Sequence, residues 1–212
     1  MDDCCAAKTN ELASLRAEHR TILVLVLFIN AALFIVEASA GLLANSTALL
    51  ADSLDMLGDS LVYGFSLYVL WRSAAWKAKA ALLKGTIMAV FGAGVLLEVI
   101  HKIISGTIPS AETMGIIGAL VLLGNGICFL VLFRHRSDDL NMRSTWLCSR
   151  NDIIANLSVL VAAIGVKVFA ASWPDILVGA AIAALFLRSA FTVLRESFLE
   201  LRLLRLRSTT TA

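Results

Sequence analysis

Long apolar stretches separated by short polar connections dominate the chain. They predict helical spans at about residues 21–43, 46–71, 85–104, 113–133, 148–166 and 176–194. Each stretch is close to the roughly 20 residues that an α-helix needs to cross the hydrocarbon core of a bilayer. A membrane β-barrel would instead alternate apolar and polar residues in segments of about 10. The pattern therefore predicts an all-α protein, a six-helix transmembrane bundle.

Basic residues are distributed unevenly among the connections. The bundle divides the chain into a predicted N-terminal cytoplasmic segment (residues 1–20), a six-span transmembrane domain (21–194) and a short cytoplasmic or interfacial tail (195–212). Basic residues precede the first span, form a connection from Arg72 to Lys84, and recur between spans four and five and after span six. The opposite connections carry little besides Lys102 and Lys167. By the positive-inside rule, both termini are expected in the cytoplasm, and we expect a bacterial inner (cell) membrane location.

Composition supports a membrane protein and excludes several other classes. The chain is 59% hydrophobic, against roughly 45–50% in soluble domains. A net charge of +2 is too small to suggest nucleic-acid binding. Its four cysteines are Cys4, Cys5, Cys128 and Cys148, and their positions suggest no secreted disulfide framework. Because no nucleophile–base pair or nucleotide motif occurs, neither an enzyme nor a resident cofactor is expected.

The second span carries three acidic residues inside its apolar stretch. Asp52, Asp55 and Asp59 all lie at membrane depth, where an ionisable group costs from about 3 to more than 10 kcal/mol unless it has a partner or faces a polar cavity. Asp55 and Asp59 are four residues apart, so their carboxylates lie on one face of the helix, one turn apart. This geometry suits a cation.

The fifth span repeats the spacing with different ligands. Cys148 and Asp152 are four residues apart, and Asn156 follows one turn later. Two facing helices, each with two ligands, can enclose a tetrahedral site of the kind that zinc prefers. We therefore predict a metal site formed by Asp55, Asp59, Cys148 and Asp152. The thiolate favours zinc or cadmium, and the site's formal charge near −4 requires that it hold either metal or protons.

Several polar residues have alternative interpretations. Asp52 is near the start of its helix and is interpreted as a bystander at the interface, while Cys148 could be a small apolar filler. Glu37, Asn30 and Asn125 could line the same cavity, although hydrogen bonding between helices is the simpler expectation.

The two proposed half-sites do not lie at obviously equal depths. Asp152 is about 21 residues from the turn at Trp173, whereas Asp55 is only about 10 residues from the turn at Asn45. Even if Lys167 marks the outer interface, a mismatch of about 5 Å remains at 1.5 Å per residue.

These motifs resemble those of the cation diffusion facilitators. The segment ALLADSLDMLGDSL is similar to that family's second-span signature, in which a His or Asp precedes an Asp by four positions. The segment SRNDIIANLSVL resembles the fifth-span signature, with Cys148 at the usual His position and Asp152 at the Asp. WPDILVGAAIAALFLRSA resembles the entry into span six.

The resemblance implies proton-coupled export of a divalent cation from the cytoplasm, usually by a homodimer. It also implies that spans one, two, four and five surround the transport site, while spans three and six form a separate pair. The family commonly continues into a soluble cytoplasmic domain, and this chain is expected to be a short form whose dimer rests on membrane helices or the tail.

The predicted function is therefore proton-coupled export of zinc or cadmium, with cobalt, nickel, iron or manganese as further candidates. A channel or carrier for another cation would use the same acidic lumen without a dehydrated metal. A helical membrane scaffold would pair the buried acids with basic residues of a partner. The predicted partners are divalent metal ions, protons, lipid and a second copy of the chain.

Overall fold

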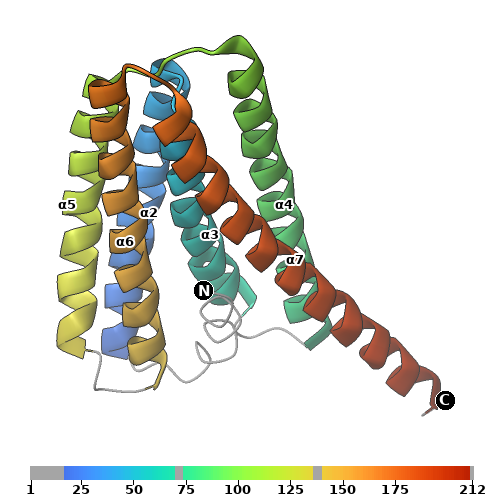
Figure 1. The fold of residues 1–212 in the computed structure, drawn as a ribbon. Coiled ribbons are helices and arrows are strands. Elements are labelled where there is room, and N and C mark those ends of the chain that lie inside the picture. The colour runs from blue at the N-terminus through green and yellow to red at the C-terminus, as the bar shows by residue number, and fades with distance from the viewer. Residues whose placement is uncertain (1–16, 70–73, 136–139, 211–212) are drawn as a thin grey trace.

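The computed structural model describes residues 17–69, 74–135 and 140–210 (Figure 1). Within these ranges it contains the following α-helices: α2 (Ala17–Ala44), α3 (Thr47–Val69), α4 (Ala74–Ser105), α5 (Ala111–His135), α6 (Leu140–Phe169) and α7 (Trp173–Thr210). These helices confirm the all-α fold and correspond in order to the six predicted spans. Cys4 and Cys5 lie outside the described residues.

Five of the described helices are long and apolar enough to cross a membrane. The spanning stretches are Val24–Ala44, Ala78–Ser105, Ala111–Arg134, Ser149–Phe169 and Trp173–Leu203. Helix α3 falls short of this standard because every 18-residue stretch of it contains Asp52, Asp55 and Asp59. Its role as a sixth span stays a prediction.

Two predicted boundaries differ from those observed. Residues 74–84 were predicted as part of a basic connection, and this is wrong because they form the first turns of α4. Residues 195–210 continue α7 without a break. Both segments are rich in Ala, Leu, Lys, Arg or Glu, the residues with the highest helix propensity, and contain no Gly or Pro to end the helix.

The turn between α2 and α3 is fixed by local hydrogen bonds. Asn45 has φ = 51°, a left-handed conformation that Asn tolerates better than most residues. The Ser46 amide donates to the carbonyl of Gly41 at 2.9 Å, the bond that closes a helix C-terminus of the Schellman type. The Ser46 hydroxyl then accepts a hydrogen bond from the Leu49 amide at 3.2 Å and so caps the start of α3.

The helices pack in two groups joined by α3. Helix α4 packs most extensively on α7, α5 on α6, and α2 on α3, and α5 also contacts α2. Gly85 and Gly92 of α4 lie against Leu194 and Leu187 of α7, where small residues allow close approach. In Figure 1, α7 slants across the molecule towards α4, and α3 contacts both of them as well as α2 and α6. The α4–α7 pair therefore matches the arrangement that the family resemblance implies.

A buried ion pair joins three helices at the turn end, the end of the bundle that carries the α2–α3, α4–α5 and α6–α7 connections. The Lys102 ammonium of α4 lies 2.8 Å from the Asp175 carboxylate of α7, and these side chains are 2% and 0% exposed. Lys102 also donates to the Asn45 carbonyl. Lys102 is therefore not the exposed connection residue that the charge pattern suggested.

Asp175 also caps α3 from another part of the chain. Its carboxylate accepts hydrogen bonds from the Ser46 hydroxyl at 2.6 Å and from the Thr47 and Ala48 amides at 2.9 and 3.1 Å. The Thr47 hydroxyl adds another at 2.7 Å. The first amides of a helix have no partner within the helix and carry partial positive charge, so an anionic acceptor here is favourable. Asp175 and Lys102, together with these partners, form what we call the clasp.

Candidate metal centre

A layer of polar side chains from four different helices lies in the bundle interior. Asn156 of α6 donates from Nδ2 to Asp52 Oδ2 of α3 at 2.7 Å, and Asn125 of α5 donates to Asn156 Oδ1 at 2.9 Å. The Glu37 carboxyl of α2 faces that of Asp52. All four side chains are at most 1% exposed. We call this group the polar layer.

The polar layer changes two predictions made from the sequence. Asp52 is not an interface residue, because it is buried and hydrogen-bonded to another helix. Asn125 does bond between helices as expected, whereas Asn30 donates to the Val26 carbonyl one turn earlier in its own helix.

The Asp52–Asn156 hydrogen bond also sets the register between the two helices with predicted ligands. Helices α3 and α6 run in opposite directions (Figure 1). Going four residues from Asp52 towards the end of α3 therefore covers about 6 Å along the bundle axis. Going four residues from Asn156 back towards the start of α6 covers the same distance in the same direction. Asp152 is then level with residues 55 and 56 of α3. The depth mismatch expected from loop distances is therefore wrong, because distance from a turn does not measure depth when helices extend to different heights.

The predicted acidic ligands are partly buried on the side of the polar layer away from the turn end. Asp55 interacts electrostatically with the Glu37 and Asp52 carboxyls. Asp59 and Asp152 each interact with the thiol of Cys128. The side chain of Cys148 lies outside the described residues. Among the side chains that the structure does describe, no three from His, Cys, Asp and Glu gather closely enough to hold a metal ion.

Cys128 of α5 is a residue that sequence reasoning passed over. It is 2% exposed, its thiol is free, and it lies near acidic residues of both α3 and α6. Cys128 follows Asn125 by three residues, so both side chains lie on one face of α5. This spacing is visible in the sequence and could have pointed to Cys128. A buried thiol beside carboxylates adds a soft donor to the region where the predicted ligands lie.

The arrangement is chemically suited to a cation. Asp side chains are too short to reach the membrane surface from this depth, so the charge must be balanced inside the bundle. Carboxylate, carboxamide and thiol groups together offer cation ligands.

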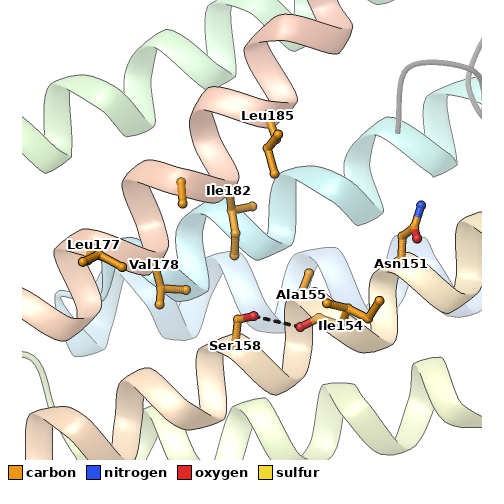
Figure 2. Close-up of a pocket in the computed structure, with 9 residues that line it drawn as sticks. Asn151, Ile154, Ala155, Ser158, Leu177, Val178, Ile182 and Leu185 are labelled. Atoms are coloured by element: carbon orange, nitrogen blue, oxygen red, sulfur yellow. Dashed lines mark hydrogen bonds between the residues drawn. The ribbon is translucent and has the colours of Figure 1, made fainter.

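A groove between α6 and α7 is distinct from this acidic region (Figure 2). It has a volume of about 400 Å³ and is lined mainly by apolar side chains such as Ile154, Ile182 and Leu185. Its polar members are Asn151 and Ser158, and the Ser158 hydroxyl donates to the Ile154 carbonyl of its own helix at 2.9 Å. Because no acidic residue lines the groove among the side chains that the structure describes, the groove does not extend the cation site.

Carboxyl groups buried between the helices of a membrane bundle commonly mark the pathway of an ion. The family model of the cation efflux transmembrane domain matches residues 23–202. The chain therefore belongs to the cation efflux family and is an integral membrane protein. This confirms the resemblance seen in the motifs of spans two, five and six, and it confirms a transporter and not an enzyme.

Two curated relatives show more distant similarity. A zinc transporter ZitB of Yersinia pestis is 31% identical over 129 residues, which cover 60% of this chain and 39% of the relative. A zinc transporter ZitB of Yersinia pseudotuberculosis serotype I (strain IP32953) is 30% identical over 129 residues, which again cover 60% of this chain and 39% of the relative. The match thus spans about two fifths of the length of these relatives.

Proposed function

We propose that the protein exports a divalent transition-metal cation from the cytoplasm in exchange for protons, with zinc or cadmium as the preferred cargo. The proposed ligands are Asp55 and Asp59 of α3 with Cys148 and Asp152 of α6. Membership in the cation efflux family and similarity to proteins named zinc transporters support this cargo class.

The observation that carries the proposal is the register set by the hydrogen bond between Asp52 and Asn156. With this register, Asp152 is level with Met56 and Cys148 with Ser60, so each lies within one residue, about 1.5 Å of rise, of Asp55 and Asp59 respectively. A tetrahedral zinc site needs four such ligands around one point. The two half-sites recognised in the sequence are therefore at compatible depths.

Exchange follows from the charge of the proposed site. Three carboxylates and a thiolate cannot all stay ionised and unoccupied in a medium of low dielectric constant. The site therefore holds either a metal ion or protons. When the site faces the cytoplasm, the metal displaces protons; when it faces outward, protons displace the metal. A proton gradient directed into the cell thus drives metal out.

Transport into proteoliposomes tests the proposal. We expect zinc uptake that depends on an imposed pH gradient and that falls to the level of empty liposomes in Asp55→Ala and Asp152→Ala. Glu98→Gln is the matched control, because Glu98 is an acidic residue of α4 whose side chain is 40% exposed. Uptake that persists in both aspartate variants, or that ignores the pH gradient, would contradict the proposal.

We also propose that both termini face the cytoplasm and that two copies associate through membrane helices. Basic residues cluster at the end of the bundle where α2 begins and α7 ends, as the positive-inside rule requires for cytoplasmic termini. Reporter fusions at each terminus test the topology, and native mass spectrometry tests the dimer. A reporter active on the outer side, or a monomer throughout, would refute the corresponding statement.

A further inference from the structure

The polar layer lies about one helical turn nearer the turn end than the ligands proposed above. It combines two carboxyl groups, from Glu37 and Asp52, with two carboxamides, from Asn125 and Asn156. These side chains come from α2, α3, α5 and α6, so the layer closes only when all four helices are assembled. At most 1% of each side chain is exposed.

Two members of the layer have acceptor atoms that no described donor satisfies. Both oxygens of the Glu37 carboxyl are buried and receive no hydrogen bond from a described N–H or O–H group, and the carboxyl can hydrogen-bond the facing Asp52 carboxyl only if one of the two carries a proton. Asn125 uses its amide nitrogen on Asn156, which leaves Asn125 Oδ1 buried without a partner. Buried polar atoms normally have partners, and an unpaired buried carboxylate is especially costly.

The buried ammonium of Lys102 is already bound elsewhere. The Lys102 ammonium is bound to Asp175 and to the Asn45 carbonyl at the turn end. The Asp55 carboxylate, which also interacts with Glu37 and Asp52, adds negative charge. The layer therefore presents unused oxygen atoms and excess negative charge at one point between four helices.

We propose that the polar layer is a second cation station, in which Glu37, Asp52, Asn125 and Asn156 bind a divalent cation through oxygen atoms alone. Oxygen ligands favour harder cations such as Mn²⁺, in contrast to a site that includes a thiolate. The two stations are only about 6 Å apart, so electrostatic repulsion makes them successive positions for one cation. This inference goes beyond the proposed export site and does not depend on that site's metal.

Removing the first station exposes the second to measurement. The full chain carrying Asp59→Ala and Asp152→Ala is purified in lipid nanodiscs, and free Mn²⁺ is followed by electron paramagnetic resonance during titration. We expect one saturable Mn²⁺ site in this background. Adding Glu37→Gln should weaken it at least about tenfold, since it removes a carboxylate ligand. Adding Glu98→Gln, an acidic residue outside the layer, should leave it unchanged.

Folding of each variant is checked by its thermal unfolding transition. If Glu37→Gln does not fold, Asn125→Ala takes its place and should also weaken Mn²⁺ binding, because it removes an oxygen ligand. Absence of saturable Mn²⁺ binding in the background protein would overturn the proposal. Equal affinity in the Glu37→Gln and Glu98→Gln variants would overturn it as well. Neither result bears on zinc transport by the wild-type chain, so failure of this inference is distinguishable from failure of the proposed function.

Discussion

The clasp predicts an unequal cost for losing its two charges. In Asp175→Ala, Lys102 stays buried with no counterion, and the first amides of α3 lose their acceptor. In Lys102→Met, the Asp175 carboxylate keeps its hydrogen bonds from the hydroxyls and amides at the start of α3. The aspartate variant should therefore be the less stable one, although each variant removes one partner of the same ion pair.

Magnitudes follow from burial and from the number of hydrogen bonds lost. Removing Asp175 should cost about 3–5 kcal/mol, the range for breaking a buried pair and leaving an uncompensated charge. Removing Lys102 should cost about 1.5–3 kcal/mol, the worth of a hydrogen bond to a charged group. In the double variant neither charge is stranded, so the combined loss should be smaller than the sum of the single losses by about 1–3 kcal/mol.

Equilibrium unfolding in mixed micelles, with increasing SDS and helicity followed by circular dichroism, measures these free energies. The control is Glu98→Gln, which breaks an exposed contact of 3.6 Å to His101 on the same helix and should cost about 0–1 kcal/mol. A cost for Asp175→Ala no larger than that of the control would refute the reasoning. Strict additivity in the double variant would refute it too.

Three further predictions concern packing, the polar layer and the thiol. Gly179→Ala should destabilise the protein by about 1–3 kcal/mol in the same SDS titration, because the added Cβ would lie 2.6 Å from the backbone of the first residue of α3. The control Gly126→Ala, which has open space around the added Cβ, should change stability by about 1 kcal/mol or less. Equal effects of the two variants would contradict the packing. Asn156→Ala should lower stability by about 1–3 kcal/mol, because it leaves polar partners in α3 and α5 unsatisfied. The control Ser158→Ala, which loses only a hydrogen bond to its own helix, should lower stability by about 0.5 kcal/mol or less. A larger loss of stability in Ser158→Ala than in Asn156→Ala would contradict the structural role of the polar layer. Cys128→Ala should leave zinc uptake into proteoliposomes within about threefold of wild type, under 1 kcal/mol, because this thiol is not among the proposed ligands; loss of uptake would show that it is one.

The apolar pattern was sufficient to predict the helices, because a spanning helix satisfies its own backbone hydrogen bonds and needs only length and hydrophobicity. The four-residue spacing of Asp55 and Asp59 is likewise a local property of one helix. Their burial could be anticipated from the cost of placing acids in lipid. These features depend on residues close together in the chain.

The clasp and the polar layer were not predictable in the same way. Asp175 bonds to Thr47, which is 128 residues away, and Asn156 bonds to Asp52, which is 104 away. Such pairs depend on the axial register and rotation of packed helices, which hydrophobicity does not encode. Lys102 illustrates the problem, because charge counting treats it as an exposed residue while its partner lies in another helix.

The central claim is that α3 and α6 jointly bind one cation, and Cd²⁺ binding by the purified full chain in nanodiscs at neutral pH tests it most directly. Isothermal titration should give one tight site in the wild-type protein and in Glu98→Gln. Asp55→Ala and Asp152→Ala, one on each helix, should each weaken this site by at least about 100-fold, equivalent to ~2.7 kcal/mol. Unchanged Cd²⁺ affinity in either aspartate variant would contradict the account.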